Sequence, residues 1–338
     1  MSVTHQQVME PIVCGHPAAA RLLPSFDVAR LLEDLDRLDD HQWALQQTFT
    51  SAGLAERAPY DWRALPLRSP TGRPERTDPG GAGLDEFADT PWLAQAPYFA
   101  EILASIPAPL RCVRLLALGP GAVGEVHFDT KVGFPWGNLR LHVPITTNPG
   151  AALIIEGVEH RWQPGTFWFG DFGRWHQVLN TGQDKRIHMI VDTLITPETL
   201  SLFPPDFLDT LSADEVLYAR PAVPLEDPER YHCAFEIPAS FADWEEAEGQ
   251  FLLPQPKLAA TIESDADGNR LVLTLDGEPT FGLVHVGEGE FRFTGWTEER
   301  TLQVVPGGAA PAVVLRTRRG TAERRLEIPA TRRIPSAA

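Results

Sequence analysis

The stretch that decides the fold runs from Gly124 to Pro149, GEVHFDTKVGFPWGNLRLHVPITTNP. Polar and apolar residues alternate along it, and Gly, Pro and Asn interrupt it, which is typical of short strands joined by turns. Working outward from this stretch, we predict strands near 111–118, 124–130, 138–146, 151–156, 166–170, 175–180 and 185–194. Short strands at this spacing indicate an antiparallel sandwich or barrel.

Two histidines and one aspartate form a candidate metal site. A strand over 124–130 would point His127 and Asp129 the same way, because side chains two apart share a face. His176, 47 positions after Asp129, lies on another predicted strand. Two imidazoles and a carboxylate are the facial set that holds Fe(II) with positions open for a co-substrate and O₂. The alternatives are another metal, or histidines that are hydrogen-bonded in the core beside an Asp129 that caps a turn.

Basic residues follow the last of these ligands. Arg186 comes ten positions after His176, and in KRIHMIVD it shares a face with His188. A buried guanidinium needs an anion, and arginine binds carboxylates through two parallel hydrogen bonds. We therefore expect Arg186 to bind the distal carboxylate of 2-oxoglutarate, with Arg140 and His142 as further donors. The alternative is that these three residues are surface or structural groups.

With these residues in place, the chain resembles the aspartyl/asparaginyl β-hydroxylase family of Fe(II)/2-oxoglutarate-dependent dioxygenases. The matching core segments are LGPGAVGEVHFD, RLHVPITTNP, GTFWFGDFGRWHQVLN and RIHMIVD. DWRALPLRS and TPWLAQAPYFAEILASIP extend the resemblance to about residues 20–195. It implies a double-stranded β-helix (a jelly roll, cupin-like) and Fe(II), 2-oxoglutarate and O₂ as cofactor and co-substrates.

The resemblance also implies roles for single residues. It assigns iron binding and catalysis to His127, Asp129 and His176, co-substrate binding to Arg186, Arg140 and His142, and supporting roles to Asp171 and Asn180. Some family members lack a carboxylate at the position of Asp129. Its presence here favours the ordinary facial set and argues against halogenation, because a halide needs the iron position that the carboxylate fills.

Composition divides the chain into four parts. We expect a flexible arm over 1–20, a dioxygenase domain over 21–195, a helical, Pro-rich connector over 196–250 and a small β-rich module over 251–338. Helical patterns near 25–46 and 92–105 flank a mainly β fold. The Pro- and Gly-rich segment 67–90 is expected to be a connector or a lid over the site.

The substrate is less directly encoded. Phe134 and Trp136 could line the substrate mouth or simply pack in their loop, and Arg174 could face a substrate carboxylate or lie on the surface. The C-terminal module favours a large substrate, such as a peptide that adds a strand to a sheet edge. Its alternative roles are to stabilise the main domain or to mediate oligomer formation.

We therefore predict a hydroxylase that acts on an unactivated C–H bond of an amino-acid side chain, in a peptide or carrier-bound substrate, as in natural-product tailoring. The alternatives are a non-catalytic cupin-like protein that binds or senses a small ligand, and a metal-dependent isomerase or lyase that needs no oxygen.

Bulk properties restrict partners and location. A net charge of −17 argues against nucleic-acid binding. The apolar runs are too short to cross a membrane, and the N-terminal residues lack a signal-peptide pattern. The three cysteines, Cys14, Cys112 and Cys233, are scattered, so we expect a cytoplasmic location.

Overall fold

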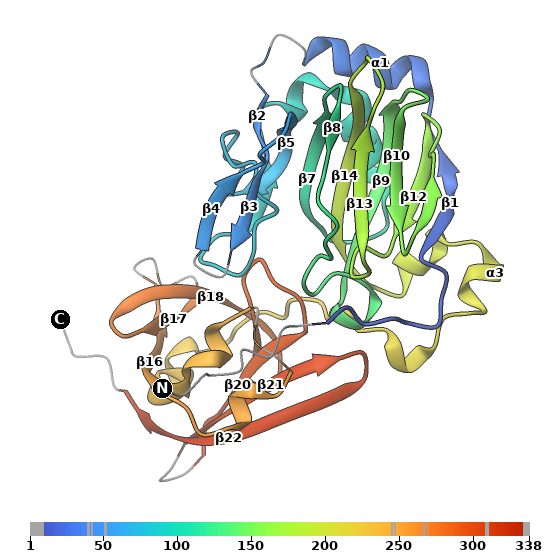
Figure 1. The fold of residues 1–338 in the computed structure, drawn as a ribbon. Coiled ribbons are helices and arrows are strands. Elements are labelled where there is room, and N and C mark those ends of the chain that lie inside the picture. Colours follow the sequence, from blue (N-terminus) through green and yellow to red (C-terminus); the bar gives the residue numbers. More distant parts are fainter. Residues whose placement is uncertain are drawn as a thin grey trace, which may run out of the picture. The chain divides into compact units, whose positions relative to one another are not determined.

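The structure is a computed structural model that describes residues 10–333 except 39, 40, 42, 51, 52, 245, 247, 266, 267, 269 and 308–310 (Figure 1). Residues 1–9 of the predicted arm over 1–20 therefore lie outside the described residues. The chain divides into two units. We call Pro11–Gly80 with Phe87–Tyr218 the jelly-roll unit, and Gly81–Glu86 with the chain from Ala219 onward the barrel unit.

The jelly-roll unit contains two antiparallel sheets. The larger has the order β1 (Ala19–Ser25), β12 (Thr166–Gly170), β9 (Asn138–Thr146), β14 (Arg186–Leu194), β7 (Leu110–Leu118), β5 (Trp62–Pro70) and β2 (Ala44–Leu45), with β6 (Phe87–Asp89) paired to β5. The smaller has the order β11 (Val158–His160), β10 (Ala151–Ile155), β13 (His176–Asn180) and β8 (Ala122–Val123). A separate hairpin joins β3 (Gln47–Thr50) and β4 (Gly53–Arg57).

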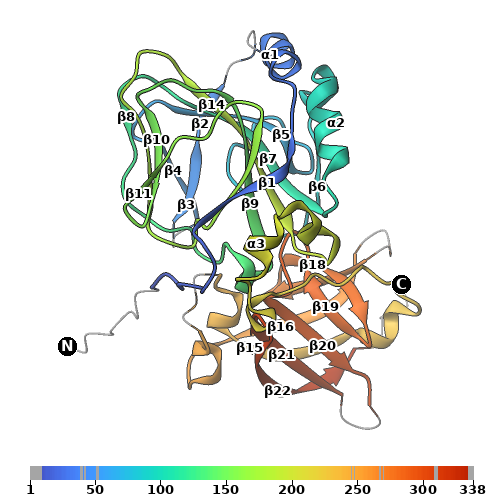
Figure 2. The ribbon, with the colours of Figure 1, turned by 90° about the vertical axis from the view of Figure 1, so that its right-hand side faces the viewer.

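The two sheets face each other, and one part of the space between them is filled by an apolar cluster. Leu118 and Trp168 of the larger sheet pack with Leu153, Ile155 and Val178 of the smaller one. Figure 2 shows this unit along a different direction, with β8, β10 and β11 opposite β14 and β9. This arrangement confirms the predicted jelly-roll class.

Helices cover the outer face of the larger sheet. α1 (Val28–Arg37) begins at Asp27, whose carboxylate accepts hydrogen bonds from the backbone of Ala29 and Arg30. α2 (Pro97–Ser105) begins with a proline, which suits the first helical turn because no backbone donor is lost there. Leu31 and Phe99, one from each helix, are fully buried between the helices and the larger sheet. We call this hydrophobic cluster the outer core. Burying a side chain of this size contributes roughly 1.5–3 kcal/mol.

Strand alternation separates the outer core from the functional interior. The odd-numbered residues of β14 from Ile187 to Val191 pack into the outer core with the helices. The even-numbered residues Arg186, His188 and Asp192 therefore point toward the smaller sheet. The predicted sharing of one face by Arg186 and His188 is confirmed.

One predicted strand is absent. Residues 124–130 make no continuous ladder, and their only pairing is an isolated bridge between His127 and His176. The amide of Asp129 donates instead to the carbonyl of Phe172, at 2.8 Å, and Lys131 then takes a left-handed φ of 57°. The segment is therefore a loop held by tertiary hydrogen bonds. The strands β1 to β6, β8 and β11 were not predicted.

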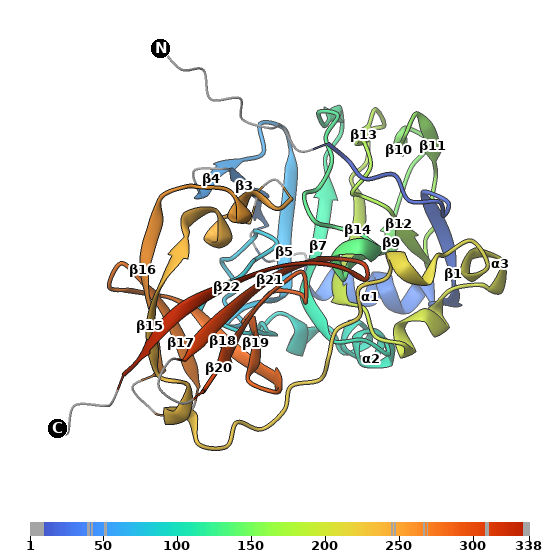
Figure 3. The same cartoon turned by 90° about the horizontal axis from the view of Figure 1, so that it is seen from below.

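The barrel unit is a closed eight-stranded barrel. Its strands pair in chain order, and the last returns to the first: β15 (Cys233–Pro238), β16 (Lys257–Ser264), β17 (Leu271–Leu275), β18 (Glu278–Gly287), β19 (Glu290–Phe293), β20 (Arg300–Val305), β21 (Ala312–Arg319) and β22 (Ala322–Arg332). Side chains fill its interior, including the buried Phe291 and Phe293. Figure 3 shows its strands from below.

The barrel differs from the predicted module in extent. Its first strand starts at Cys233, inside the predicted connector, whereas Phe203 and Phe207 of that connector pack into the jelly-roll core. Part of the predicted 67–90 loop belongs to the barrel unit, because Gly83 exchanges backbone hydrogen bonds with Gly282 and Thr294. Because the described strands of the barrel form a closed ring, they offer no free edge for strand addition.

Among the described residues, no helix has both the length and the apolar character needed to cross a bilayer.

Candidate metal centre and co-substrate pocket

The structure brings His127, Asp129 and His176 together. One potential ligand atom of each lies within 4.8 Å of those of the other two. The backbones of His127 and His176 exchange hydrogen bonds of 3.0 and 2.7 Å, which fixes the two histidines side by side. Asp129 is held by the bond from its amide to Phe172. The three donors thus converge although they lie on a loop and on β13.

Both imidazoles have the orientation that metal binding would require. Nδ1 of His127 donates to the carbonyl of Glu125, and Nδ1 of His176 donates to the carbonyl of Arg174, each at 2.9 Å. A carbonyl only accepts, so each Nδ1 carries the proton and each Nε2 presents a lone pair. Burial lowers the pKa of His176, which favours the neutral form that binds metals. These residues fit a divalent ion such as Fe(II).

The carboxylate of Asp129 is kept ionised. Burial alone would raise its pKa, but Arg140 and the two histidines lower it below the ordinary value. Nη1 of Arg140 donates to Oδ2 of Asp129, while Oδ1 lies 3.8 Å from Nε2 of His127. One carboxylate oxygen therefore faces the histidines and the other faces the arginine.

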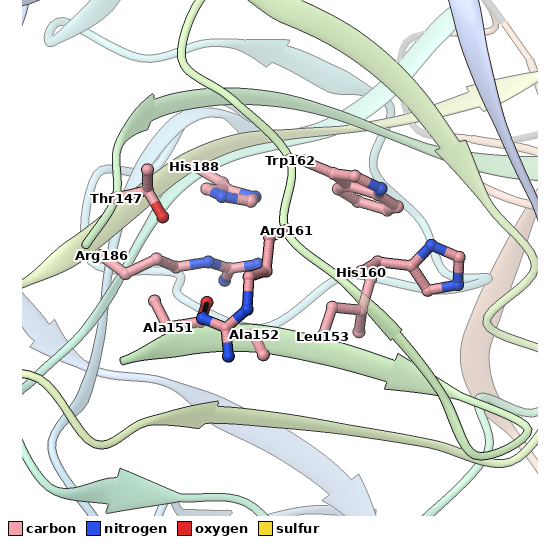
Figure 4. A pocket seen from close by; sticks show the side chains of 9 residues that line it. All are labelled: Thr147, Ala151, Ala152, Leu153, His160, Arg161, Trp162, Arg186 and His188. Atoms are coloured by element: carbon pink, nitrogen blue, oxygen red, sulfur yellow. Dashed lines mark hydrogen bonds between the residues drawn. The ribbon is translucent and has the colours of Figure 1, made fainter. Parts of the chain in front are cut away.

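A pocket lies between the two sheets of the jelly-roll unit (Figure 4). Arg186 and His188 of β14 line it from one side, and Ala151 and Leu153 of β10 line it from the other. In Figure 4 the Arg186 side chain reaches across the pocket beside His188. The guanidinium is buried, which lowers its pKa to about 9, and no described residue forms an ion pair with it. A buried cation without a protein anion fits an anionic ligand.

A histidine pair lies beside Arg186. Nδ1 of His142 and Nδ1 of His188 are 3.2 Å apart, so one ring donates to the other. Burial, followed by the charge of Arg186, lowers the pKa of both residues well below the ordinary value, and both are neutral at pH 7. The His142 ring stacks on Phe172, with ring centroids 4.8 Å apart, and Phe172 also contacts His176. His142 thus lies between the arginine pocket and the metal ligands.

Arg140 is positioned differently from Arg186. Its guanidinium is held between Asp192 and Asp129, and it does not line the pocket. Contact between Arg140 and the co-substrate stays a prediction.

The residues predicted to meet the substrate have protein partners. Phe134 is fully buried against Phe169, Phe203 and Phe207, which is the loop-packing alternative. Trp136 is also buried. Neither residue forms an exposed wall. The 133–137 turn folds inward because Gly133 and Gly137 adopt positive φ angles.

Arg174 is buried and neither lies on the surface nor faces an open site. It donates to the carboxylates of Asp171 and Glu156 and to the carbonyls of Cys14 and His16. The guanidinium therefore ties the N-terminal segment to the loop over 171–174, which precedes β13 and accepts the hydrogen bond from the amide of Asp129. Asp171 supports this arrangement.

Asn180 has a structural role at the turn after β13. Its side-chain amide donates to the carbonyls of Leu118 and Asp184 and accepts from Asn148 and Gly182.

The sequence analysis did not identify Asp192 as a site residue. Strand alternation could have found it, because Asp192 lies four positions after His188 and therefore shares its side of β14.

The chain matches the aspartyl/asparaginyl β-hydroxylase family over residues 26–195, which is half of its length. It belongs to this family of Fe(II)/2-oxoglutarate-dependent hydroxylases.

A curated relative is the L-proline cis-4-hydroxylase of Rhizobium meliloti (strain 1021), which is 27% identical over 185 residues. The match covers 54% of this chain and 61% of the relative, less than two thirds of its length.

Solved structures to which the chain is similar include an oxidoreductase of the 2OG-Fe(II) oxygenase family from Burkholderia pseudomallei. It is 10% identical, with a TM-score of 0.35, and the match covers 52% of this chain and 85% of that one. A Pseudomonas putida prolyl-4-hydroxylase is 13% identical with a TM-score of 0.33, covering 54% and 94%. These low scores add no detail to the family assignment.

Proposed function

We propose that this protein is an Fe(II)/2-oxoglutarate-dependent hydroxylase that acts on an unactivated C–H bond of an amino-acid side chain. One observation carries the proposal. The interior that holds the convergent set of His127, Asp129 and His176 also holds Arg186, a buried cation without an anionic partner among the described residues. A metal chelator with a distal carboxylate suits both ends of such a site.

The side chains divide the work between them. His127, Asp129 and His176 would hold the iron, which supplies O₂ activation coupled to oxidative decarboxylation of 2-oxoglutarate when it is bound. Arg186 binds the distal carboxylate through charge-assisted hydrogen bonds. The neutral pair of His142 and His188 offers a hydrogen-bond donor without a second positive charge. The buried aromatic rings around them exclude water from the interior.

The relative supports the proposed substrate class. An enzyme named for hydroxylation of L-proline supports an amino acid as substrate, and we extend this to prolyl residues in peptides and to carrier-bound amino acids, as in natural-product tailoring. The barrel unit supports a larger substrate, because a free amino acid needs no docking platform. The barrel unit would bind such a substrate through side chains on its surface, or it would instead join copies of the chain into an oligomer. The scattered cysteines support a cytoplasmic location.

Succinate formation tests the proposal. The purified full chain is incubated with Fe(II), ascorbate, 2-oxoglutarate and O₂, together with free L-proline, other amino acids or prolyl peptides. We expect succinate in stoichiometric ratio to hydroxylated product, and neither product without oxygen. Absence of 2-oxoglutarate binding, measured by calorimetry with a redox-silent metal, would favour the small-ligand binding protein instead.

Activity that persists under anaerobic conditions would favour a lyase or an isomerase. The matched variant is Arg186→Gln, which keeps the three metal ligands. We expect it to bind metal normally and to lose most of its 2-oxoglutarate affinity.

A further inference from the structure

Asp192 and Arg140 form a buried ion pair next to the metal ligands. They are directly opposed in the register of β14 and β9, so both side chains lie on the inner face of the larger sheet. Nε and Nη2 of Arg140 donate to the two oxygens of Asp192, at 2.7 and 3.1 Å. This two-pronged contact fixes the plane of the guanidinium.

Asp192 is itself fixed from a second side. Nη2 of Arg114, on the neighbouring strand β7, lies 3.6 Å from Oδ2 of Asp192, and both side chains are only 3% exposed. Arg114 is anchored in turn, because its Nη1 donates to the carbonyl of Thr77. Asp192 therefore has little freedom to move within the sheet.

The remaining donor of Arg140 acts on the metal site. With Nε and Nη2 engaged by Asp192, Nη1 points to Oδ2 of Asp129. The carboxylate of Asp129 is thereby prevented from rotating freely, and its other oxygen, Oδ1, is left toward His127. A ligand held in this way loses less conformational entropy when it binds an ion.

We propose that Asp192 is a positioning residue of the metal centre. Acting through Arg140, it sets the orientation in which Asp129 offers one oxygen to the ion. This inference rests on the proposed function, because it presupposes that the site binds a divalent metal. It gives Arg140 a role at the carboxylate ligand and leaves Arg186 as the residue that binds the co-substrate.

The test is metal affinity, measured anaerobically without 2-oxoglutarate. Asp192→Asn keeps the shape of the side chain, but its amide nitrogen cannot accept a hydrogen bond from Arg140. We expect the dissociation constant for Co(II) or Mn(II) to rise by about 10- to 100-fold, as found for residues that orient metal ligands. The visible spectrum of the Co(II) form should also change, since it reports the carboxylate's coordination. An unchanged dissociation constant and spectrum would overturn the inference.

A double-mutant cycle separates positioning from simple loss of negative charge. In the Arg140→Gln background, Asp192→Asn should have little further effect on the dissociation constant, because the intermediary is gone. If the full loss persists in that background, Asp192 acts as a distant charge and the inference is wrong. Arg186→Gln is the contrast, because it should weaken 2-oxoglutarate binding and leave the affinity for metal unchanged.

Two further measurements keep the outcomes distinct. If Asp192→Asn does not fold, Asp192→Glu retains the charge but displaces the carboxylate by one methylene, and it should show a smaller loss of metal affinity with the same dependence on Arg140. Loss of equal size in both backgrounds would again contradict the inference. If the unaltered protein binds neither Co(II) nor Mn(II), it is the proposed function that fails.

Discussion

The backbones of His127 and His176 are joined by a reciprocal pair of hydrogen bonds, of 3.0 and 2.7 Å. The spacing of the two histidines is therefore set by the main chain and does not depend on side-chain packing. Asp129 is attached less directly, through the carbonyl of Phe172. The loop over residues 171–174 thus controls how well the third ligand meets the other two.

Replacing Arg186 by methionine should stabilise the protein when no ligand is bound. The buried guanidinium has no anionic partner among the described residues, and apolar replacement even of paired buried charges is often stabilising, by about 1–4 kcal/mol. The free energy of unfolding in urea measures this. The same variant should lose the stabilisation that saturating 2-oxoglutarate and Mn(II) give the unaltered protein, about 2.7 kcal/mol at 100 times the dissociation constant. A variant that is less stable and is still stabilised by 2-oxoglutarate would contradict this role.

Arg174→Gln should destabilise the jelly-roll unit strongly. It removes a buried cation from Asp171 and from the carbonyls of Cys14 and His16, and breaking a buried pair costs about 3–5 kcal/mol. Thermal unfolding followed by tryptophan fluorescence gives the shift in Tm. The matched control is Arg63→Gln, because Arg63 and its partner Asp61 are both more than 40% exposed and such pairs contribute only about 0.2–1 kcal/mol. Equal shifts in the two variants would show that Arg174 does not anchor the N-terminal segment.

Gly173→Ala should weaken metal binding without altering any ligand. A Cβ at this position would lie 2.5 Å from the carbonyl oxygen of Val132, so the backbone of the loop must shift. The neighbouring carbonyls of Phe172 and Arg174 accept hydrogen bonds from Asp129 and His176, and both bonds would be disturbed. Calorimetric titration with Mn(II) should show a loss of about tenfold or more. Gly15→Ala is the control, because a Cβ there meets no atom within 4 Å and should leave the titration unchanged.

The protein should lose stability as the pH falls below about 6.5. Burial, with the charge of Arg186 adding to it, holds the pKa of His142 and His188 well below the 6.5 of an unfolded chain. At a pH between the folded and the unfolded pKa, the unfolded state binds more protons than the folded state. The free energy of unfolding therefore decreases as the pH decreases. Each histidine contributes a slope of up to about 1.4 kcal/mol per pH unit.

Urea unfolding of the metal-free protein, from about pH 7.5 to about pH 5.5, measures this slope. The double variant His142→Phe/His188→Leu should have a shallower slope. An identical slope in the variant would show that other groups dominate the acid sensitivity.

Much of the fold and part of the site could be predicted from the sequence. Strand alternation placed Arg186 with His188 and Arg140 with His142, because a period of two is a local property of the chain. The loop over residues 124–130 could not be predicted, since its backbone hydrogen bonds go to residues more than 40 positions away. Its alternating pattern is the same as that of a strand.

The partners of Arg140 and Arg174 illustrate the second limit. Sequence spacing shows which way an arginine points, but the anion it meets depends on strand register and on distant segments. Asp192 meets Arg140 only because β14 and β9 pair in one register, and Arg174 reaches the carbonyls of Cys14 and His16 from about 160 positions away.

The segment Gly81–Glu86 has a consequence for any attempt to separate the two units. Past Pro11, the chain crosses from one unit to the other after Gly80, after Glu86 and again after Tyr218. The segments of the two units thus alternate along the sequence, and more than one connection joins them. Cleavage after Tyr218 alone would leave Gly81–Glu86 on the fragment that carries the jelly-roll unit, and the detached barrel would lack Gly83, the backbone partner of Gly282 and Thr294. A barrel cut off at this point would therefore be an incomplete piece of the native architecture.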